Sequence, residues 1–275
     1  MLTQNPFALL NGTLPLSVMQ IFVALMVLAV IVGTLLDMAH KGSAQYFFAN
    51  ARKSRAQGKP VDKASIAIKT VAVDVLASGE FCNPRRRLAH LLTMYGFILY
   101  LLATVIQVYV YPTAASPAPA LVPALWWLGA VMVMLGGYWF WFFIRVDVAA
   151  EGSSPWRLMR ADLFIVSLLA SVTFGVIWAW LQASGSAASW LFFALYLLAT
   201  AVLFGGVYWS KFAHMFFKPA AAFDKRVAEA DGTNMNLPLL SRDDPAQRER
   251  HSMELLRNAP MDMGLGIKRE APRHY

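Results

Sequence analysis

The chain has 275 residues, of which 58% are hydrophobic and only 15% are charged. A soluble domain carries about 25% charged residues, so this composition, with a mean hydropathy of +0.49, indicates a polytopic membrane protein. The single cysteine, Cys82, excludes a disulfide framework and an iron–sulfur cluster held by this chain alone, since such a cluster needs about four thiolates. The net charge of +8 is what a membrane topology can produce, and we expect no nucleic-acid partner.

Five segments have the length and composition of membrane-crossing helices, which need about 20 mostly apolar residues. In chain order they are Leu16–Leu36, Leu88–Tyr111, Leu121–Ile144, Leu163–Leu181 and Trp190–Phe217. The last segment is longer than a perpendicular span requires, so we expect it to be tilted or to project into the cytoplasm. The sequence therefore predicts an all-α membrane protein with five transmembrane helices.

The distribution of lysine and arginine predicts the orientation of these helices. The leader before the first span has no basic residue, and neither have residues 112–120 or 182–189. Residues 41–87 carry ten basic residues, and the tail from Lys218 onward carries another ten. We therefore expect a multi-pass protein of the inner (cytoplasmic) membrane, with its N-terminus outside and its C-terminus in the cytoplasm.

This topology predicts a membrane domain over residues 1–217, with a cytoplasmic loop at 41–87, and a cytoplasmic tail at 218–275. Within the loop, ASIAIKTVAVDVLASGE (residues 64–80) is apolar enough to be a helix that lies on the membrane or against a partner. The tail is too short and too polar to build its own core. We expect the tail to be disordered or to be ordered by docking a partner subunit.

Three histidines fall at the predicted cytoplasmic face. His40 ends the first span, His90 begins the second, and His214 lies near the end of the fifth. One such histidine can be a boundary residue, but two on different helices at similar depth favour a shared site, because polar groups at membrane depth usually face the bundle interior. Facing imidazoles can supply both axial ligands of a b-type haem, here His90 and His214. Arg86 and Arg87 are then available for the haem propionates.

His40 remains a competing ligand for the haem iron, because spacing alone does not choose among the three histidines. Asp37 and His40 are three residues apart and share a face of the first span, so they are candidates for proton exchange with a quinone. Lys211 is the third candidate for this quinone site. Asp37 can equally extend toward the cytoplasm as a boundary residue.

Two motifs carry a resemblance to a known family. RRRLAHLLTMYGF (residues 85–97) opens the second span, and YWSKFAHMFFKPAAAF (208–223) closes the fifth. Both resemble the five-span cytochrome b family, which includes the gamma subunit of respiratory nitrate reductase and the membrane subunits of heterodisulfide-reductase-like complexes. TVAVDVLASGEFCNP (70–84) resembles the approach to the second span in that family. The likeness is greatest to the membrane subunit or anchor associated with dissimilatory adenylylsulfate reductase.

The resemblance implies a cytoplasmic haem held by His90 and His214. The family has a second, outer pair of histidines, and this chain has Tyr100 and Tyr196 at the corresponding positions. Tyrosine does not replace histidine in a low-spin bis-imidazole site, so we expect one haem b at most.

The function that this resemblance implies is electron transfer between membrane quinone and a docked cytoplasmic iron–sulfur flavoprotein of sulfur metabolism, of the adenylylsulfate reductase type. The chain would be an oxidoreductase subunit with no catalytic residue of its own, because the chemistry on the substrate belongs to the partner. The alternative is a haem-free structural anchor that recruits the same enzyme. A transporter or channel is disfavoured, because the sequence has no internal repeat and no charge at mid-membrane.

Overall fold

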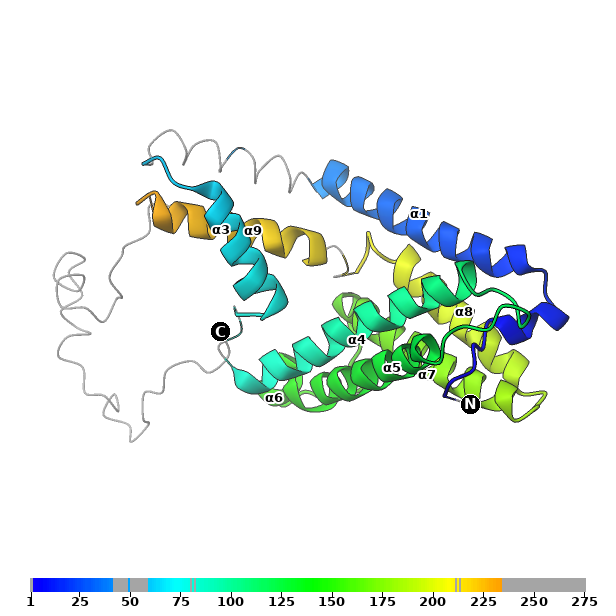
Figure 1. Cartoon of the computed structure of the whole chain (residues 1–275). Coiled ribbons are helices and arrows are strands. Elements are labelled where there is room, and N and C mark those ends of the chain that lie inside the picture. Colours follow the sequence, from blue (N-terminus) through cyan, green and yellow to red (C-terminus); the bar gives the residue numbers. More distant parts are fainter. Residues whose placement is uncertain are drawn as a thin grey trace. The chain divides into compact units, whose positions relative to one another are not determined.

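The computed structural model describes residues 2–41, 49, 59–79, 81, 83–210, 212 and 214–233. All regular elements within these ranges are helices. The chain divides into two compact units (Figure 1). We call Met1–Gln45 with Ala77–Lys218 the membrane unit, and Tyr46–Leu76 with Pro219–Tyr275 the small unit.

Four helices of the membrane unit are long and apolar enough to cross a membrane. They are α1 (Leu16–Lys41), α4 (Pro84–Tyr109), α5 (Leu121–Trp139) with its π-helical continuation η3 (Phe140–Ile144), and α7 (Leu163–Ala183). Their positions agree with the first four predicted segments. The start of α4 is set locally, because the side chain of Asn83 accepts hydrogen bonds from the first backbone N–H groups and Pro84 follows as the first helical residue.

The fifth predicted segment, Trp190–Phe217, is not one continuous helix, and this prediction is wrong. Helix α8 (Ser189–Gly205) has 17 residues, a length of about 26 Å, against a hydrocarbon thickness of about 30 Å. The chain then turns, and α9 (His214–Ala230) begins as a new helix. Two consecutive glycines lie at the break, and a Cβ on Gly206 would lie only 2.5 Å from the carbonyl oxygen of Val202.

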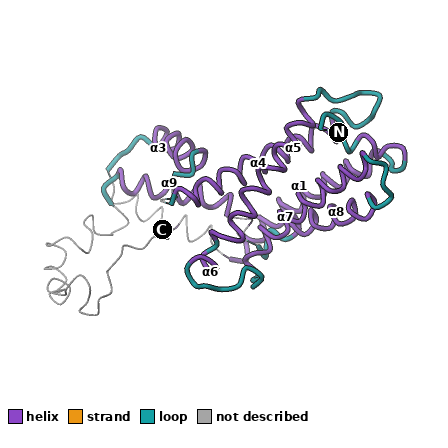
Figure 2. Tube along the Cα trace, turned by 90° about the horizontal axis from the view of Figure 1, so that it is seen from below, coloured by secondary structure: helices purple, strands orange, loops and turns teal. Residues whose placement is uncertain are grey.

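The bundle is built from close helix pairs: α4 packs against α5, α7 packs against α8, and α1 contacts α8 (Figure 2). Glycine permits the α4–α5 contact. A Cβ on Gly96 would lie 2.8 Å from the carbonyl oxygen of Gly129, and a Cβ on Gly129 would lie 2.6 Å from the backbone nitrogen of Tyr100. Small residues allow membrane helices to approach closely, so these glycines serve helix packing.

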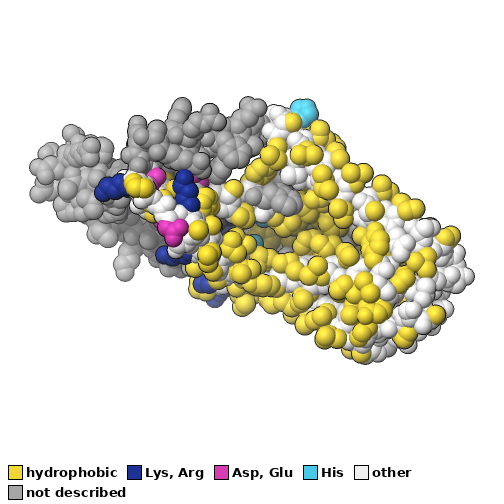
Figure 3. Space-filling view, turned by 45° about the horizontal axis from the view of Figure 1, so that its top comes forward, with side chains coloured by type: hydrophobic (Ala, Val, Ile, Leu, Met, Phe, Trp, Pro, Cys, Tyr) yellow, Lys and Arg dark blue, Asp and Glu magenta, His cyan; other side chains and the backbone are white. Residues whose placement is uncertain are grey.

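Large apolar side chains cover the outside of the bundle as well as its core. Trp126, Val133 and Trp178 are completely or almost completely buried, whereas Leu28 and Leu35 on α1 are more than half exposed. In the view of Figure 3, hydrophobic side chains occupy most of the visible bundle surface. Exposed apolar surface of this extent suits a lipid environment.

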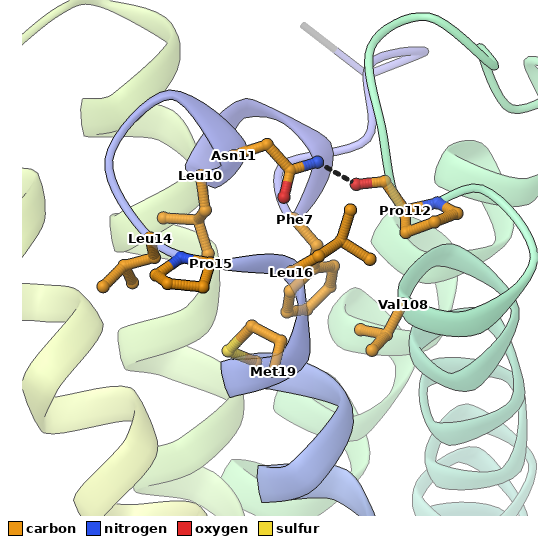
Figure 4. Close-up of a pocket in the computed structure, with 9 residues that line it drawn as sticks. All are labelled: Phe7, Leu10, Asn11, Leu14, Pro15, Leu16, Met19, Val108 and Pro112. Atoms are coloured by element: carbon orange, nitrogen blue, oxygen red, sulfur yellow. Dashed lines mark hydrogen bonds between the residues drawn. The ribbon is translucent and has the colours of Figure 1, made fainter.

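The N-terminal leader closes one end of the bundle. The side-chain amide of Asn5 donates to the carbonyl oxygens of Gln107 (3.1 Å) and Tyr111 (2.7 Å) at the end of α4. The ring of Phe7 enters the core, with its centroid 5.2 Å from that of Trp178. The side-chain amide of Asn11 donates to the carbonyl oxygen of Pro112, which follows α4, and both residues line a small apolar pocket (Figure 4).

The small unit pairs part of the predicted cytoplasmic loop with the beginning of the predicted tail. Helix α3 (Lys63–Lys69) continues directly into the π-helix η2 (Thr70–Leu76). The guanidinium of Arg226 on α9 donates to both carboxylate oxygens of Asp74, at 2.5 and 2.8 Å. The rest of the predicted tail, residues 234–275, lies outside the described residues.

Candidate functional site

The candidate site lies at the end of the bundle where α4 and α7 begin, which we call the basic end. A buried ion pair organises the loop between η3 and α7 at this end: Arg145 donates to the carboxylate of Asp162 at 2.9 Å. Arg145 is only 4% exposed. Its guanidinium also donates to the carbonyl oxygen of Arg157 at 2.9 Å and lies 4.0 Å from the ring centroid of Trp141. The guanidinium charge is therefore paired with a carboxylate, and it also stabilises the loop backbone through hydrogen bonds.

His90 lies in the second turn of α4 and is half-buried. Its Nδ1 atom lies 3.0 Å from the hydroxyl oxygen of Ser78, and its ring packs on that of Phe81 with a centroid distance of 4.8 Å. Either group can be the donor in this hydrogen bond, which holds the orientation of the ring. Nε2 is therefore the ring nitrogen left for a ligand.

The turn before α4 holds this arrangement in place. Ser78 has a positive φ of 50°, which is uncommon for a residue other than glycine, and it is 1% exposed. The carbonyl oxygen of the preceding Ala77 accepts a hydrogen bond from Nε of Arg87 at 2.8 Å. A buried residue in this conformation, bonded to a histidine, is typical of a functional constraint. Sequence reasoning missed Ser78 and Phe81, although the Ser-Gly pair ahead of the N-cap indicates a turn here.

His214 is the first residue of α9, and its ring meets the ring of Phe164 edge-on at a centroid distance of 5.9 Å. His214 and Lys218 both lie close enough to His90 to interact with it electrostatically. Lys218 also lies over the ring of Phe81, 5.5 Å from its centroid. The two histidines, 124 positions apart in the sequence, are thus brought to the same end of the bundle.

Arg86 and Arg87 lie beside this pair and hold backbone carbonyl groups. Nη2 of Arg86 donates to the carbonyl oxygen of Ile144 at 3.1 Å, and Nε of Arg87 donates to that of Ala77. Each guanidinium has further N–H groups beyond these bonds. The arginine run thus connects α4 to the end of η3 and to the turn that contacts His90.

The candidate quinone residues are only partly described. Asp37 is buried in α1, at 3% exposed. His40 is exposed near the end of the same helix, its Nδ1 lies 3.2 Å from the carbonyl oxygen of Leu36, and its ring meets that of Tyr208 edge-on. Lys211 lies outside the described residues. The structure thus places His40 against Tyr208, whereas His90 lies against Ser78 and Phe81.

Tyr100 and Tyr196 occupy the core nearer the opposite end of the bundle. Tyr100 packs on the ring of Trp126 at a centroid distance of 4.9 Å, and Tyr196 stacks on Trp178 at 5.6 Å. Both tyrosines meet at Gly175 of α7, where a Cβ would lie 2.5 Å from the hydroxyl oxygen of Tyr100 and 3.2 Å from the ring of Tyr196. Aromatic rings therefore fill the core at this depth.

Comparisons with protein-family models, with curated proteins and with solved structures found no match. The resemblance to five-span cytochrome b proteins therefore stays a prediction from the two motifs, and the candidate site rests on its own geometry.

Proposed function

We propose that the chain is a membrane subunit that would hold one haem b at the basic end through His90 and His214. The observation that carries this proposal is that the two histidines, one from α4 and one from α9, lie within electrostatic range of each other at one end of the bundle, with the His90 ring bonded to Ser78. Histidines that bind metal usually make such a hydrogen bond through their other ring nitrogen, so the donor set fits a haem. A proton on Nδ1, donated to Ser78, leaves the lone pair of Nε2 for the iron.

A haem with two imidazole ligands supplies one-electron transfer. The chain's own residues would orient the group and balance its charge. His90 and His214 bind it from two helices, and the N–H groups of Arg86 and Arg87 that do not hold backbone are available to its propionates. The aromatic core around Tyr100 supports a limit of one haem, because rings already fill the space there.

The proposed topology has five spans, of which α8 is the short fifth one. The protein would lie in the inner membrane, with its N-terminus outside and its basic end facing the cytoplasm. The distribution of basic residues supports this orientation. Electrons would pass between membrane quinone and a docked cytoplasmic iron–sulfur flavoenzyme of the adenylylsulfate reductase type. Quinone suits a membrane subunit because it is lipid-soluble, and Asp37 and His40 are the described residues proposed to exchange its protons. This partner and this pathway rest on the sequence resemblance.

A haem-free anchor is the second candidate function. The small unit favours it, because the bidentate contact between Arg226 and Asp74 builds a helix pair from two segments outside the spans, and such a pair can serve as a docking element. In this case His90 and Ser78 would only stabilise the turn before α4.

Histidine variants test the proposed haem site. The purified chain, and its His90→Ala, His214→Ala and His40→Ala variants, would be compared by dithionite-reduced-minus-oxidised spectra. We expect the α-band of a b-type haem in the unmodified chain and in His40→Ala, and its loss or a shift to a high-spin spectrum in the other two. Unchanged spectra in both the His90 and the His214 variant would refute the ligand assignment. A spectrum lost in His40→Ala would instead make His40 a ligand.

A further inference from the structure

The helical segment Lys63–Leu76 has two faces of different environment. One face packs within the small unit, where Thr70 is 2% exposed and Asp74 is bonded to Arg226. The other face is apolar and uncovered, with Ile68 71% exposed and Val71 51% exposed. The ion pair to α9 fixes the rotation of the segment, so the apolar face is presented in a defined direction.

This segment immediately precedes a membrane-crossing helix in the sequence. Leu76, the last residue of η2, is joined directly to Ala77, whose carbonyl oxygen accepts a hydrogen bond from Arg87 of α4 at 2.8 Å. The next residue, Ser78, contacts His90 in the second turn of α4. Only residues 77–83 separate η2 from α4, a candidate span that begins at Pro84, so a short stretch of chain tethers the segment to that span.

The charge of the segment complements an anionic surface. Lys63 and Lys69 are exposed on α3, and the exposed apolar face lies beside them. Apolar side chains next to basic ones are typical of helices that lie in a membrane interface, and basic residues close to an anionic leaflet gain electrostatic attraction to its lipids.

We propose that the segment Lys63–Leu76 lies in the interface of an anionic membrane. Ile68, Val71 and Leu76 enter the boundary between headgroups and acyl chains, and Lys63 and Lys69 contact lipid phosphates. The occupant of the uncovered face is the lipid surface that surrounds the spans, and the pair of Asp74 with Arg226 holds the segment in the rotation that presents this face. This inference does not depend on the proposed haem.

Site-specific fluorescence tests the proposal in the full chain. On a Cys82→Ser background, the Ile68→Cys and Val71→Cys variants would be labelled with an environment-sensitive nitrobenzoxadiazole dye and placed in phosphatidylglycerol nanodiscs. The control is Glu229→Cys, at an exposed polar position of the same unit. We expect quenching by doxyl-labelled lipid at 68 and 71 to be at least about threefold stronger than at 229, and iodide to quench 229 preferentially.

Four results would overturn the proposal. Iodide quenching at 68 and 71 as strong as at 229 would place the face in water. Protection from both quenchers would indicate that protein covers the face. Equal lipid quenching in phosphatidylcholine nanodiscs, or no effect of a Lys63→Gln, Lys69→Gln double variant, would remove the anionic lipid from the proposal. Size-exclusion profiles that match the unmodified chain would establish that each labelled variant is folded.

Discussion

The contact between Asp74 and Arg226 should control how firmly the small unit stays closed. The two side chains are 152 positions apart and are joined by two hydrogen bonds, at 2.5 and 2.8 Å. They are largely covered, with 10% of the Asp74 side chain and 23% of the Arg226 side chain exposed. We predict that Arg226→Gln loosens the packing of Lys63–Leu76 against α9.

The expected magnitude lies between that of an exposed and that of a buried ion pair. A hydrogen bond to a charged group contributes about 1.5–3 kcal/mol, and an exposed pair contributes about 0–1 kcal/mol. Partial exposure lets water solvate the Asp74 carboxylate after the substitution, so we expect the free energy that keeps the small unit closed to fall by about 1–2 kcal/mol. This corresponds to an open population of the unit that is roughly 5–30 times larger.

Hydrogen exchange measured by mass spectrometry reports this opening directly. Peptides that cover residues 63–76 should exchange roughly 5–30 times faster in Arg226→Gln than in the unmodified chain. Lys225→Gln is the matched control, because Lys225 makes only a 3.9 Å exposed pair with Glu229 on the same helix, and it should change the rates less than about twofold. Equal rates in Arg226→Gln and the unmodified chain would refute the reasoning.

The same contact predicts a dependence on pH. The hydrogen bond from Arg226 is the main cause that lowers the pKa of Asp74 below its ordinary value of 3.8. A carboxyl group with a lowered folded-state pKa stabilises the fold fully above the ordinary pKa, and this contribution is lost as the pH falls through the folded value. Below about pH 4, exchange corrected for its intrinsic rate should therefore accelerate in residues 63–76, and Asp74→Asn should remove this acceleration.

Three further substitutions test the membrane unit through its stability in detergent. Ser78→Gly should be more stable than Ser78→Ala by about 1 kcal/mol, because both lose the hydroxyl but only glycine relieves the positive φ; equal stabilities would contradict the strain. Arg145→Met should lower the free energy of unfolding by about 3–5 kcal/mol, because it leaves Asp162 as an uncompensated buried charge. An unchanged melting temperature would contradict this prediction. Gly129→Ala should lower the free energy of unfolding by about 1–3 kcal/mol, because the added Cβ would push α4 and α5 apart. Gly205→Ala is the control and should not destabilise the protein, because its Cβ would meet open space. Similar effects of the two substitutions would contradict the packing argument.

The first four spans are predictable because an apolar run of the right length needs no knowledge of its neighbours. The same reasoning fails for the fifth segment. Hydropathy registers Trp190–Phe217 as one run, but the helix ends where the backbone at Gly206 approaches Val202 too closely for a side chain. Hydropathy measures transfer into lipid and contains no term for helix termination. The break also makes His214 the first residue of a new helix rather than the end of a span.

Sequence reasoning selected His90 and His214 as the candidate site but did not find the groups that contact His90. His90 and His214 can be found because each lies close to a basic edge, and the topology puts these edges on one side. The role of Ser78 depends on a backbone conformation that serine seldom adopts. The insertion of Phe7 among the core aromatic rings depends likewise on tertiary packing that no local pattern encodes. Long-range contacts of this kind cannot be deduced from the spacing of residues along the chain.

The central claim is that His90 and His214 hold a haem at the basic end, and quantification of haem per polypeptide tests it most directly. The measurement is a pyridine haemochrome assay on the purified full chain, produced with haem synthesis supported and normalised by amino-acid analysis. The account predicts about one haem b per chain. A value near zero would contradict the claim and favour the haem-free anchor, and a value near two would contradict the limit that the core around Tyr100 and Tyr196 sets.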